Sequence, residues 1–467
     1  MQLSKVAEEL CLSGSRRLHL ALAVTICAIL AVTLFPSGGE KDEPMLRCLV
    51  CGERGVADVI LNVLLFMPFG AALSLAGVRL RRICLDAAVL SAVIELAQLF
   101  IPGRDSSLSD VLSNTTGATA GCLVVWQAPR VIRLQGLFAT LGALAAAALT
   151  VLVTAGTGLL LRPAFPASVY YGQWTPNLEH LEWYGGRVLE AQLGSIALPP
   201  RRLANSEAAR QLLVEGAPLS VRATAGPEVS RLASLVSIAD DRQREIALLG
   251  LERQALVFRY RTRSTAWRLD QPDLRVPDAL APVAPGDTFA VALWREPTGT
   301  CLALNGARTC RLGFTAGRGW AIVLYPESLA PWLMRLLDVG WVAGVLIPVG
   351  FCAHRRPALW AGGSLLAGLG LAPALTGLLS TPAGDWVGGL VGVLVGIKLR
   401  ALVSRRSAIA NGFPLRSRPD AGGRDRPRAW RGPPPPSAQS PRGPTALLRD
   451  PCSRGAARGE QAVRPPG

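Results

Sequence analysis

The chain has 467 residues, of which 50% are hydrophobic and 18% charged, and its formal net charge is +16. Low charge and high hydrophobicity over a length sufficient for two or three domains indicate a membrane protein. The basic residues gather in short arginine clusters and in residues 403–467, without the aromatic-interleaved patch of a nucleic-acid-binding surface. We therefore expect membrane lipid, and no nucleic acid, as a partner.

Eight apolar stretches are long enough, or nearly so, to cross a bilayer as helices, which takes about 20 residues each. They cover residues 18–36, 58–78, 83–102, 108–127, 137–161, 331–353, 358–380 and 383–402. Because no small-residue cleavage site follows the first stretch and more stretches come after it, we interpret it as a retained span rather than a signal peptide.

Basic clusters fall on alternate loops between these stretches. With eight crossings, all five clusters lie on one side, and short loops rich in Lys and Arg are cytoplasmic. Both termini, including residues 1–17, are then cytoplasmic. The clusters are Arg16-Arg17, Arg79/Arg81/Arg82, Arg130/Arg133, His354-Arg355-Arg356 and Lys398/Arg400/Arg405/Arg406.

The first exterior loop contains the pair Cys48-Leu-Val-Cys51. This spacing suits a disulfide bond, half of a metal site or a redox pair. No second cysteine pair has zinc-ligand spacing and the three histidines are scattered, so we expect neither a metal nor a cofactor.

Two apolar stretches then contain the same polar sequence motif. Asp58 and Asn62 open one, and Asp110 and Asn114 open the other, in each case four residues apart and hence on one helix face. Polar and ionisable groups inside a span are costly enough to require a functional or packing reason.

The helix between these two adds Glu95 and Gln98 on one face, with Arg104 just past its exterior end. The topology brings all of these groups together near the outer leaflet, which predicts a ligand site for a polar or anionic group held by Arg104. Glu95 or Asp110 is a candidate catalytic acid or base. A hydrogen-bonded packing core with a capping Asp on each helix is the structural alternative.

The ordered set of eleven positions resembles the signature of VanZ-like membrane proteins, over roughly residues 20–130. The resemblance implies a bacterial cytoplasmic-membrane protein of the cell envelope, in a family tied to lowered teicoplanin susceptibility. The matching positions are Asp58, Asn62, Phe66, Pro68, Gly70, Glu95, Gln98, Arg104, Asp110, Asn114 and Gly117.

The insert of residues 162–330 is too long for a loop and should be a folded extracytoplasmic domain. Alternating apolar positions, as in Phe258-Arg259-Tyr260, predict strands and an antiparallel β-sandwich. The segment 189–325 resembles laminin-G or concanavalin-like domains, which suggests an envelope glycan, a lipid-linked precursor or a protein as its partner. Cys301 and Cys310 flank a turn at Asn305-Gly306, and we expect a disulfide bond between them.

The predicted architecture is therefore a polytopic α-helical membrane protein with five spans in residues 18–161, an exterior β-sandwich in 162–330 and three spans in 331–402. The last span repeats part of the motif, with Asp385, Gly392 and Gly396 at the spacing of Asp110, Gly117 and Gly121. Residues 403–467, rich in Arg and Pro, should be disordered in the cytoplasm.

Three function classes remain open from the sequence. One is a binding protein with a polar site at the outer leaflet. Another is an enzyme acting on a lipid-linked saccharide, with Glu95 or Asp110 as base and Arg104 holding a phosphate or carboxylate. The third is a structural or assembly protein without chemistry. No nucleophile or metal motif supports a particular reaction, so we favour a protein that is not an enzyme.

Overall fold

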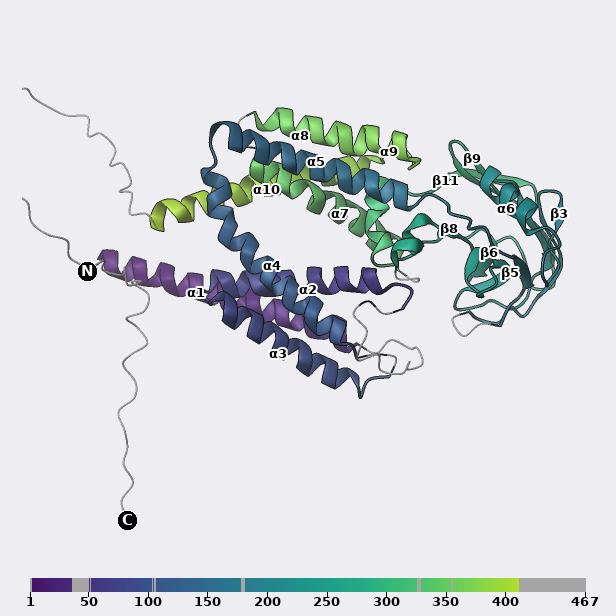
Figure 1. Ribbon diagram of the computed structural model, residues 1–467, viewed down its shortest axis with the longest axis horizontal. Coiled ribbons are helices and arrows are strands. Elements are labelled where there is room, and N and C mark those ends of the chain that lie inside the picture. Colours follow the sequence, from purple (N-terminus) through teal and green to yellow (C-terminus); the bar gives the residue numbers. More distant parts are fainter. Residues whose placement is uncertain are drawn as a thin grey trace, which may run out of the picture.

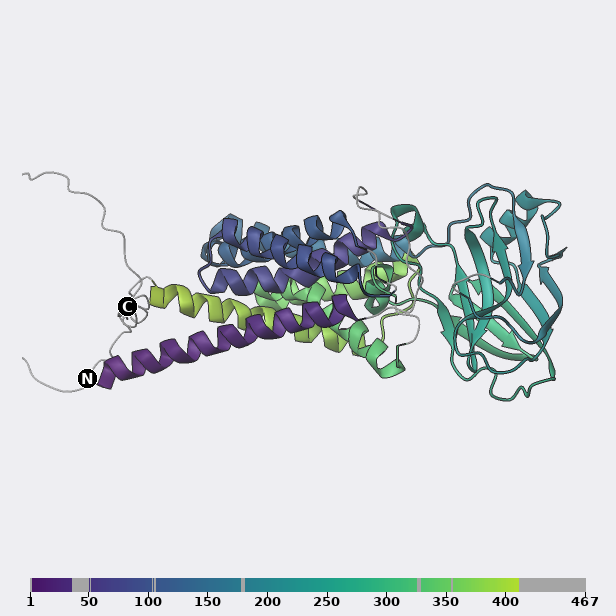
Figure 2. The ribbon, with the colours of Figure 1, turned by 90° about the horizontal axis from the view of Figure 1, so that it is seen from below.

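The structure is a computed structural model that describes residues 2–35, 50, 52–102, 104, 106–177, 181–325, 329–353 and 356–410. The helices form an elongated bundle, and the strands form a separate β unit beyond one end of it (Figure 1). The view at right angles shows the same division (Figure 2). The described chain therefore has two structural parts, a helical bundle and a β unit.

The first four helices pack as one group. Their bounds are α1 Gln2–Leu34, α2 Gly55–Leu75, α3 Leu80–Gln98 and α4 Leu108–Arg133. α2 packs lengthwise against α4, α3 lies mainly against α4, and α1 lies against α2 and α3. α1 begins at Gln2 rather than at residue 18, although its apolar part is Leu18–Leu34 as the sequence predicts.

The later helices form a second group. Their bounds are α5 Gly136–Leu160, α7 Pro331–Cys352, α8 Pro357–Leu365, the π-helical turn η3 Leu366–Leu371, α9 Ala372–Thr376 and α10 Ala383–Ala410. α7 packs lengthwise against α10, and α5 lies against α7, α8 and α9. α10 ends at Ala410 rather than at residue 402, so the predicted tail begins later; residues 411–467 lie outside the described residues.

Five helical segments in the described part of the chain are long and apolar enough to cross a membrane, which makes this a membrane protein. They are Gly55–Leu75, Gly136–Leu160, Pro331–Cys352, Pro357–Thr376 and Ala383–Arg405.

α3 and α4 have a lower mean hydropathy than these five segments because they contain polar residues, and these residues face the interior of the bundle. On α3, Leu85, Val89 and Val93 are more than half exposed, whereas Glu95 and Gln98 are buried. An apolar outer stripe over a polar inner face is the reverse of a soluble helix and suits a helix that contacts lipid. The polar residues of the inner face therefore account for the low mean hydropathy of α3, whose outer face is apolar.

The β unit contains two antiparallel sheets. One has the order β1-β5-β6-β7-β8 and the other β11-β10-β9-β4-β2-β3. Bounds for the first are β1 Tyr171–Trp174, β5 Ala233–Ala239, β6 Glu245–Glu252, β7 Ala255–Tyr260 and β8 Leu274–Val276. Bounds for the second are β2 Arg187–Leu193, β3 Ile196–Ala197, β4 Leu219–Thr224, β9 Thr288–Glu296, β10 Gly299–Leu304 and β11 Ala307–Leu312. Helix α6 Ser206–Glu215 and the short helices η1 Arg263–Trp267 and η2 Ala316–Ile322 complete it.

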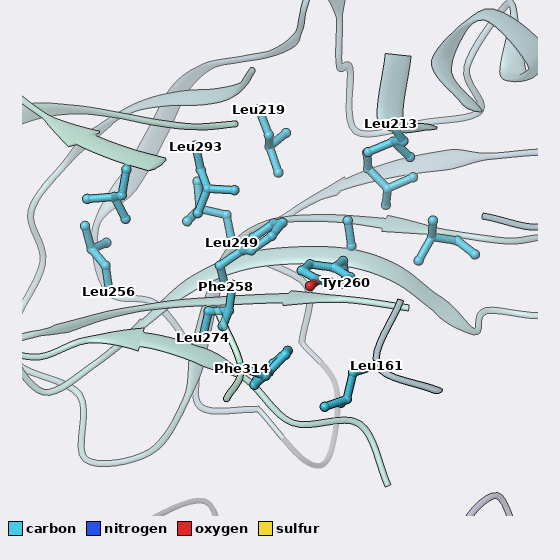
Figure 3. Packing of buried hydrophobic residues seen from close by; sticks show 14 of the residues in the cluster. Leu161, Leu213, Leu219, Leu249, Leu256, Phe258, Tyr260, Leu274, Leu293 and Phe314 are labelled. Carbon is cyan, nitrogen blue, oxygen red and sulfur yellow. The ribbon is translucent and has the colours of Figure 1, made fainter. Parts of the chain in front are cut away.

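Both sheets contribute to one hydrophobic core. Leu219 and Leu293 from the six-stranded sheet and Leu249 and Phe258 from the five-stranded sheet belong to the same buried cluster (Figure 3). In β4 and β9 buried residues alternate with less buried ones, which is the pattern of a sheet with one face toward a core. Burial of these apolar side chains stabilises the β unit.

The hairpin β10–β11 turns at Asn305 and Gly306, whose φ angles are 48° and 89°. Such left-handed values at both turn positions are typical of two-residue hairpins and explain the Asn-Gly sequence. Cys301 on β10 and Cys310 on β11 form a disulfide bond across this hairpin.

Candidate functional site

The two sequence motifs lie at the end of the bundle that faces the β unit (Figure 1). Asp58 is in the first turn of α2, and Asp110 is in the first turn of α4. Carboxylates at these positions are favoured by the partial positive charge of a helix N-terminus. α3 runs in the opposite direction and ends at Gln98, so its polar residues reach the same end.

Asp110 is the centre of this group. Its Oδ1 accepts a hydrogen bond from Asn62 Nδ2 at 2.7 Å, which joins α4 to α2. It also lies within electrostatic range of the Asp58 and Glu95 carboxylates. Asp58 stands one turn before Asn62 on α2, and it is exposed. The structure thus brings three acidic groups together around a single Asn–Asp contact.

Glu95 holds the start of α4 in place. Its Oε2 accepts a hydrogen bond from the backbone N–H of Ser107 at 2.8 Å. Ser107 is the N-cap residue of α4, and its side chain accepts from the N–H of Ser109 at 3.1 Å. Glu95 is therefore a positioning residue for the helix that carries Asp110.

Deeper in the bundle, Asn114 and Gln98 join helices. Asn114 Nδ2 donates to Ser91 Oγ at 2.8 Å, and Gln98 Nε2 donates to the carbonyl of Thr33 at 3.0 Å. Both side chains are more than nine-tenths buried, and the carbonyl oxygen of each has no hydrogen-bond partner in the described part of the chain. These contacts tie α4 to α3 and α3 to α1.

Arg104 binds the C-terminal end of α1. Its Nε donates to the carbonyl of Phe35 at 2.9 Å, and its Nη2 donates to that of Val32 at 2.8 Å. A cation suits the partial negative charge of a helix C-terminus. Within the described residues no ion pair joins Arg104 to Asp58, Glu95 or Asp110. The cation that the sequence placed beside the carboxylates is therefore used to fix α1.

Glycines bring α2 and α4 into backbone contact. A Cβ atom on Gly117 would lie 2.3 Å from the carbonyl oxygen of Val63, and one on Gly121 would lie 2.0 Å from that of Met67. Gly70 of α2 has the same relation to Ala118. Close approach of this kind fixes the distance between the helix starts that carry Asp58 and Asp110.

A second polar region, which the sequence did not predict, lies where the β unit meets α7 and α10. It is a cavity of about 490 Å³ lined by three acidic and four basic side chains together with apolar ones. Tyr325 lines it too, and burial followed by the charge of Asp273 raises the pKa of its hydroxyl to about 12. The charged lining residues are Asp273, Asp338, Asp385, Arg275, Arg311, Arg318 and Arg335.

The cysteine candidates give no metal site in the described chain. One cluster there, Glu296, Cys301 and Cys310, brings three potential ligand atoms within 4.8 Å of one another, but its two sulfur atoms are joined in the disulfide bond. Cys48 and Cys51 lie outside the described residues.

Five membrane-length apolar helical segments and a polar group at one end of the bundle define the class: a polytopic membrane protein. Residues 22–133, which comprise the C-terminal part of α1 and all of α2, α3 and α4, match the family model described as VanZ/LLP1. The VanZ-like resemblance is therefore confirmed for this segment, and the β sheets later in the chain are an addition to it. No curated protein and no solved structure matches the chain.

Proposed function

We propose that this protein is a VanZ-like membrane protein of the bacterial cell envelope whose outer-leaflet site, formed by Asp58, Asn62 and Asp110, binds an envelope component. The observation that carries the proposal is the convergence of polar groups from α2, α3 and α4 at one end of the bundle. Their cost in a membrane is explained if the site meets a polar ligand. A role in lowering susceptibility to teicoplanin-type glycopeptides follows from the family resemblance.

The proposed orientation places the β unit outside the cell and both termini in the cytoplasm. Arg79 is the N-cap residue of α3, Arg81 and Arg82 lie in its first turn, and Arg130 and Arg133 lie in the last turn of α4, all at the end away from the β unit. Arginine in short loops favours the cytoplasmic side. The start of α1 and the end of α10 lie at that end as well (Figure 1).

Exposed tryptophans support a membrane between the two ends. Trp126 near the end of α4 is 57% exposed, and Arg130 stacks 3.6 Å from its ring centre. Trp332 at the start of α7 is 68% exposed. Tryptophan is enriched at both membrane surfaces, where its ring contacts acyl chains and its N–H contacts head groups.

We propose that the two sheets form a laminin-G or concanavalin-like sandwich that binds a glycan, a lipid-linked precursor or a protein. Their shared core supports this fold. Tryptophan rings of the β unit offer surfaces on which a sugar can stack. Trp183 is 61% exposed, whereas Trp320 is buried and donates to Asp338. Trp174 and Trp294 are half-buried and donate to Leu198 and Glu296. Among these four tryptophans, Trp183 is therefore the one whose ring is exposed for stacking.

The alternatives differ in what they require of the same residues. An enzyme acting on a lipid-linked saccharide requires an open base and a phosphate-holding cation, but Glu95 and Arg104 are both engaged by backbone groups. An assembly protein requires the polar residues for packing alone, as Asn114 and Gln98 illustrate. Asp58 and Asp110 are the residues that distinguish a binding site from packing.

The test is teicoplanin susceptibility of a Gram-positive host expressing the intact chain or Asp110→Ala at matched membrane abundance. Asp86→Ala is the control, since Asp86 forms a partly exposed ion pair with Arg82 near the start of α3, at the end of the bundle away from the site. We expect the intact chain and Asp86→Ala to protect and Asp110→Ala to fail. Equal protection by all three would refute a role for the site, and protection by none would refute the resistance role.

A further inference from the structure

The helix pair α7–α10 repeats the spacing of several key residues of the pair α2–α4. In α2, Asp58-Val59 is followed by Pro68 and Gly70; in α7, Asp338-Val339 is followed by Pro348 and Gly350 at the same spacing. α4 and α10 share the spacing of an Asp and two glycines, namely Asp110, Gly117 and Gly121 and Asp385, Gly392 and Gly396. The pair α7–α10 therefore corresponds in sequence to the pair α2–α4.

The helix contacts follow the same correspondence. A Cβ on Gly117 would strike the carbonyl oxygen of Val63, and one on Gly392 would strike that of Ala343. The shift in numbering that relates Asp58 to Asp338 also relates Val63 to Ala343.

Two further pairs of contacts agree with this shift: Gly121 with Met67 and Gly396 with Ile347, and Gly70 with Ala118 and Gly350 with Val393. Agreement in three independent contacts shows that Asp338 and Asp385 occupy the places of Asp58 and Asp110.

In the second group, the β unit supplies hydrogen-bond donors to these two carboxylates. Arg318 of η2 donates from Nε and Nη2 to the two carboxylate oxygens of Asp338, at 2.9 and 3.1 Å. The N–H of Gly317 donates to Asp385 Oδ2 at 3.0 Å. A Cβ on Gly317 would lie 2.4 Å from that oxygen, so a side chain there would displace the Asp385 carboxylate. The site thus holds a guanidinium and a peptide N–H, both hydrogen-bond donors.

In the first group, no hydrogen bond or ion pair from the β unit reaches these carboxylates among the described residues, and the Arg54 guanidinium at the N-cap of α2, which lies within electrostatic range of Asp58, pairs with Asp270 at 3.5 Å instead. The β unit reaches the start of α2 through η1, where the N–H groups of Val56 and Ala57 donate to the carbonyl of Arg268. In the described part of the chain the carboxylate of Asp58 has no hydrogen-bond or ion-pair partner, while Asp110 accepts from Asn62. Within the described chain, the equivalent of the filled site therefore receives no guanidinium hydrogen bond.

We propose that the site of Asp58 and Asp110 takes a guanidinium or primary ammonium group of an envelope molecule, in the way that the equivalent site takes Arg318. This inference rests on the proposed function, in which the site binds a ligand, and it names the ligand's charge. Three carboxylates and the absence of an ion pair to Arg104 in the described chain disfavour the anionic group that the sequence suggested. A cation with several N–H donors satisfies both charge and hydrogen bonding.

The experiment uses the full chain in lipid nanodiscs with two photo-crosslinking probes. Both carry the same diazirine-bearing dodecyl chain, one with a guanidinium head and the other with a phosphate head. We expect the guanidinium probe to label the N-terminal turns of α2 and α4, and the phosphate probe to label them about tenfold less, because carboxylates accept charge-assisted hydrogen bonds from a guanidinium and repel a phosphate. Equal or stronger labelling by the phosphate probe would overturn the inference, and this comparison needs no variant.

Variants locate the labelling. Asp58→Asn/Asp110→Asn should lower guanidinium labelling about tenfold or more, whereas Asp86→Asn at the opposite end should not change it. Arg318→Ala empties the second site, so new labelling should emerge at the start of α7 and be removed again by Asp338→Asn. Unchanged labelling in the first double variant, or no new labelling in Arg318→Ala, contradicts the assignment.

The outcome is separable from that of the proposed function. Labelling at the first site together with full protection by Asp110→Ala keeps the ligand class and refutes the resistance role. Loss of protection in Asp110→Ala without guanidinium labelling keeps the role and refutes the ligand class.

Discussion

The ion pair between Arg318 and Asp338 should hold the β unit on the second helix group. Arg318→Leu removes both hydrogen bonds to Asp338 and leaves that carboxylate with Trp320 Nε1, which donates at 2.7 Å. The side chains of Arg318 and Asp338 are 25% and 13% exposed, so the pair lies between a surface pair and a buried one.

The expected cost follows from these exposures. Exposed pairs contribute about 0–1 kcal/mol, and removal of one partner from a buried pair costs about 3–5 kcal/mol. With two charge-assisted bonds in a partly exposed setting, we expect Arg318→Leu to lower the free energy of local opening by about 1.5–3 kcal/mol.

Hydrogen exchange of the backbone amides in η2 measures this opening directly. The exchange rate there should rise about 10- to 150-fold in Arg318→Leu. Arg222→Leu is the matched control, because Arg222 and Glu190 form an ion pair at 3.4 Å with side chains 57% and 48% exposed. A change in η2 no larger than that of the control would refute the docking role. In a double-mutant cycle with Asp338→Leu, a coupling energy near zero would do so as well.

Three further predictions concern packing, the disulfide bond and pH. Gly117→Ala should lower the free energy of unfolding by about 1–3 kcal/mol, because its Cβ meets the Val63 carbonyl. Gly344→Ala is the control: a Cβ there has nothing within 4 Å, so this variant should be neutral or stabilising. Equal thermal unfolding temperatures of the two variants in detergent would contradict this. Cys301→Ala/Cys310→Ala opens a loop of sequence separation 9 and should cost about 2.5 kcal/mol, measured by denaturation of the chain with and without reductant; an unchanged midpoint would argue against it. Burial raises the pKa of Asp240, but the Arg244 side chain and the N–H groups of Arg244 and Arg242 outweigh it and hold the pKa below its usual value. A lowered folded-state pKa stabilises the fold above the unfolded value, near 3.8, and this stabilisation is lost as pH falls through the folded pKa. Asp240→Asn should therefore lose stability at pH 7 and show a weaker fall in stability on acidification; a pH profile parallel to that of the unchanged chain would be inconsistent with this.

The first helix group was predictable because its signals are local. Asp58, Asn62, Asp110 and Asn114 repeat at helical spacing between apolar runs, and the family match covers these positions. The partners of these groups were not predictable. Arg104 is near the carboxylates in sequence, but its side chain points to α1, and only the packing of α1 and α3 decides this.

The second site was only half visible in the sequence. Asp385 with Gly392 and Gly396 reveals the copy of α4, but α7 retains few residues of α2, since Val342 replaces Asn62 and Leu346 replaces Phe66. What identifies α7 is the set of backbone contacts that its residues make with α10. The hydrogen bonds from Arg318 to Asp338 depend on how the β unit packs against α7, which local sequence patterns do not predict.

The most direct test of the account is whether the start of α2 opens to the outside of the cell. Asp58→Cys and Ala76→Cys place single thiols at exposed positions near opposite ends of α2, in a chain whose cysteines outside the disulfide bond are replaced by alanine. A membrane-impermeant maleimide applied to intact cells should label Asp58→Cys, and should label Ala76→Cys only after permeabilisation. Labelling of Ala76→Cys in intact cells while Asp58→Cys stays protected would place the carboxylate site in the cytoplasm and contradict the account.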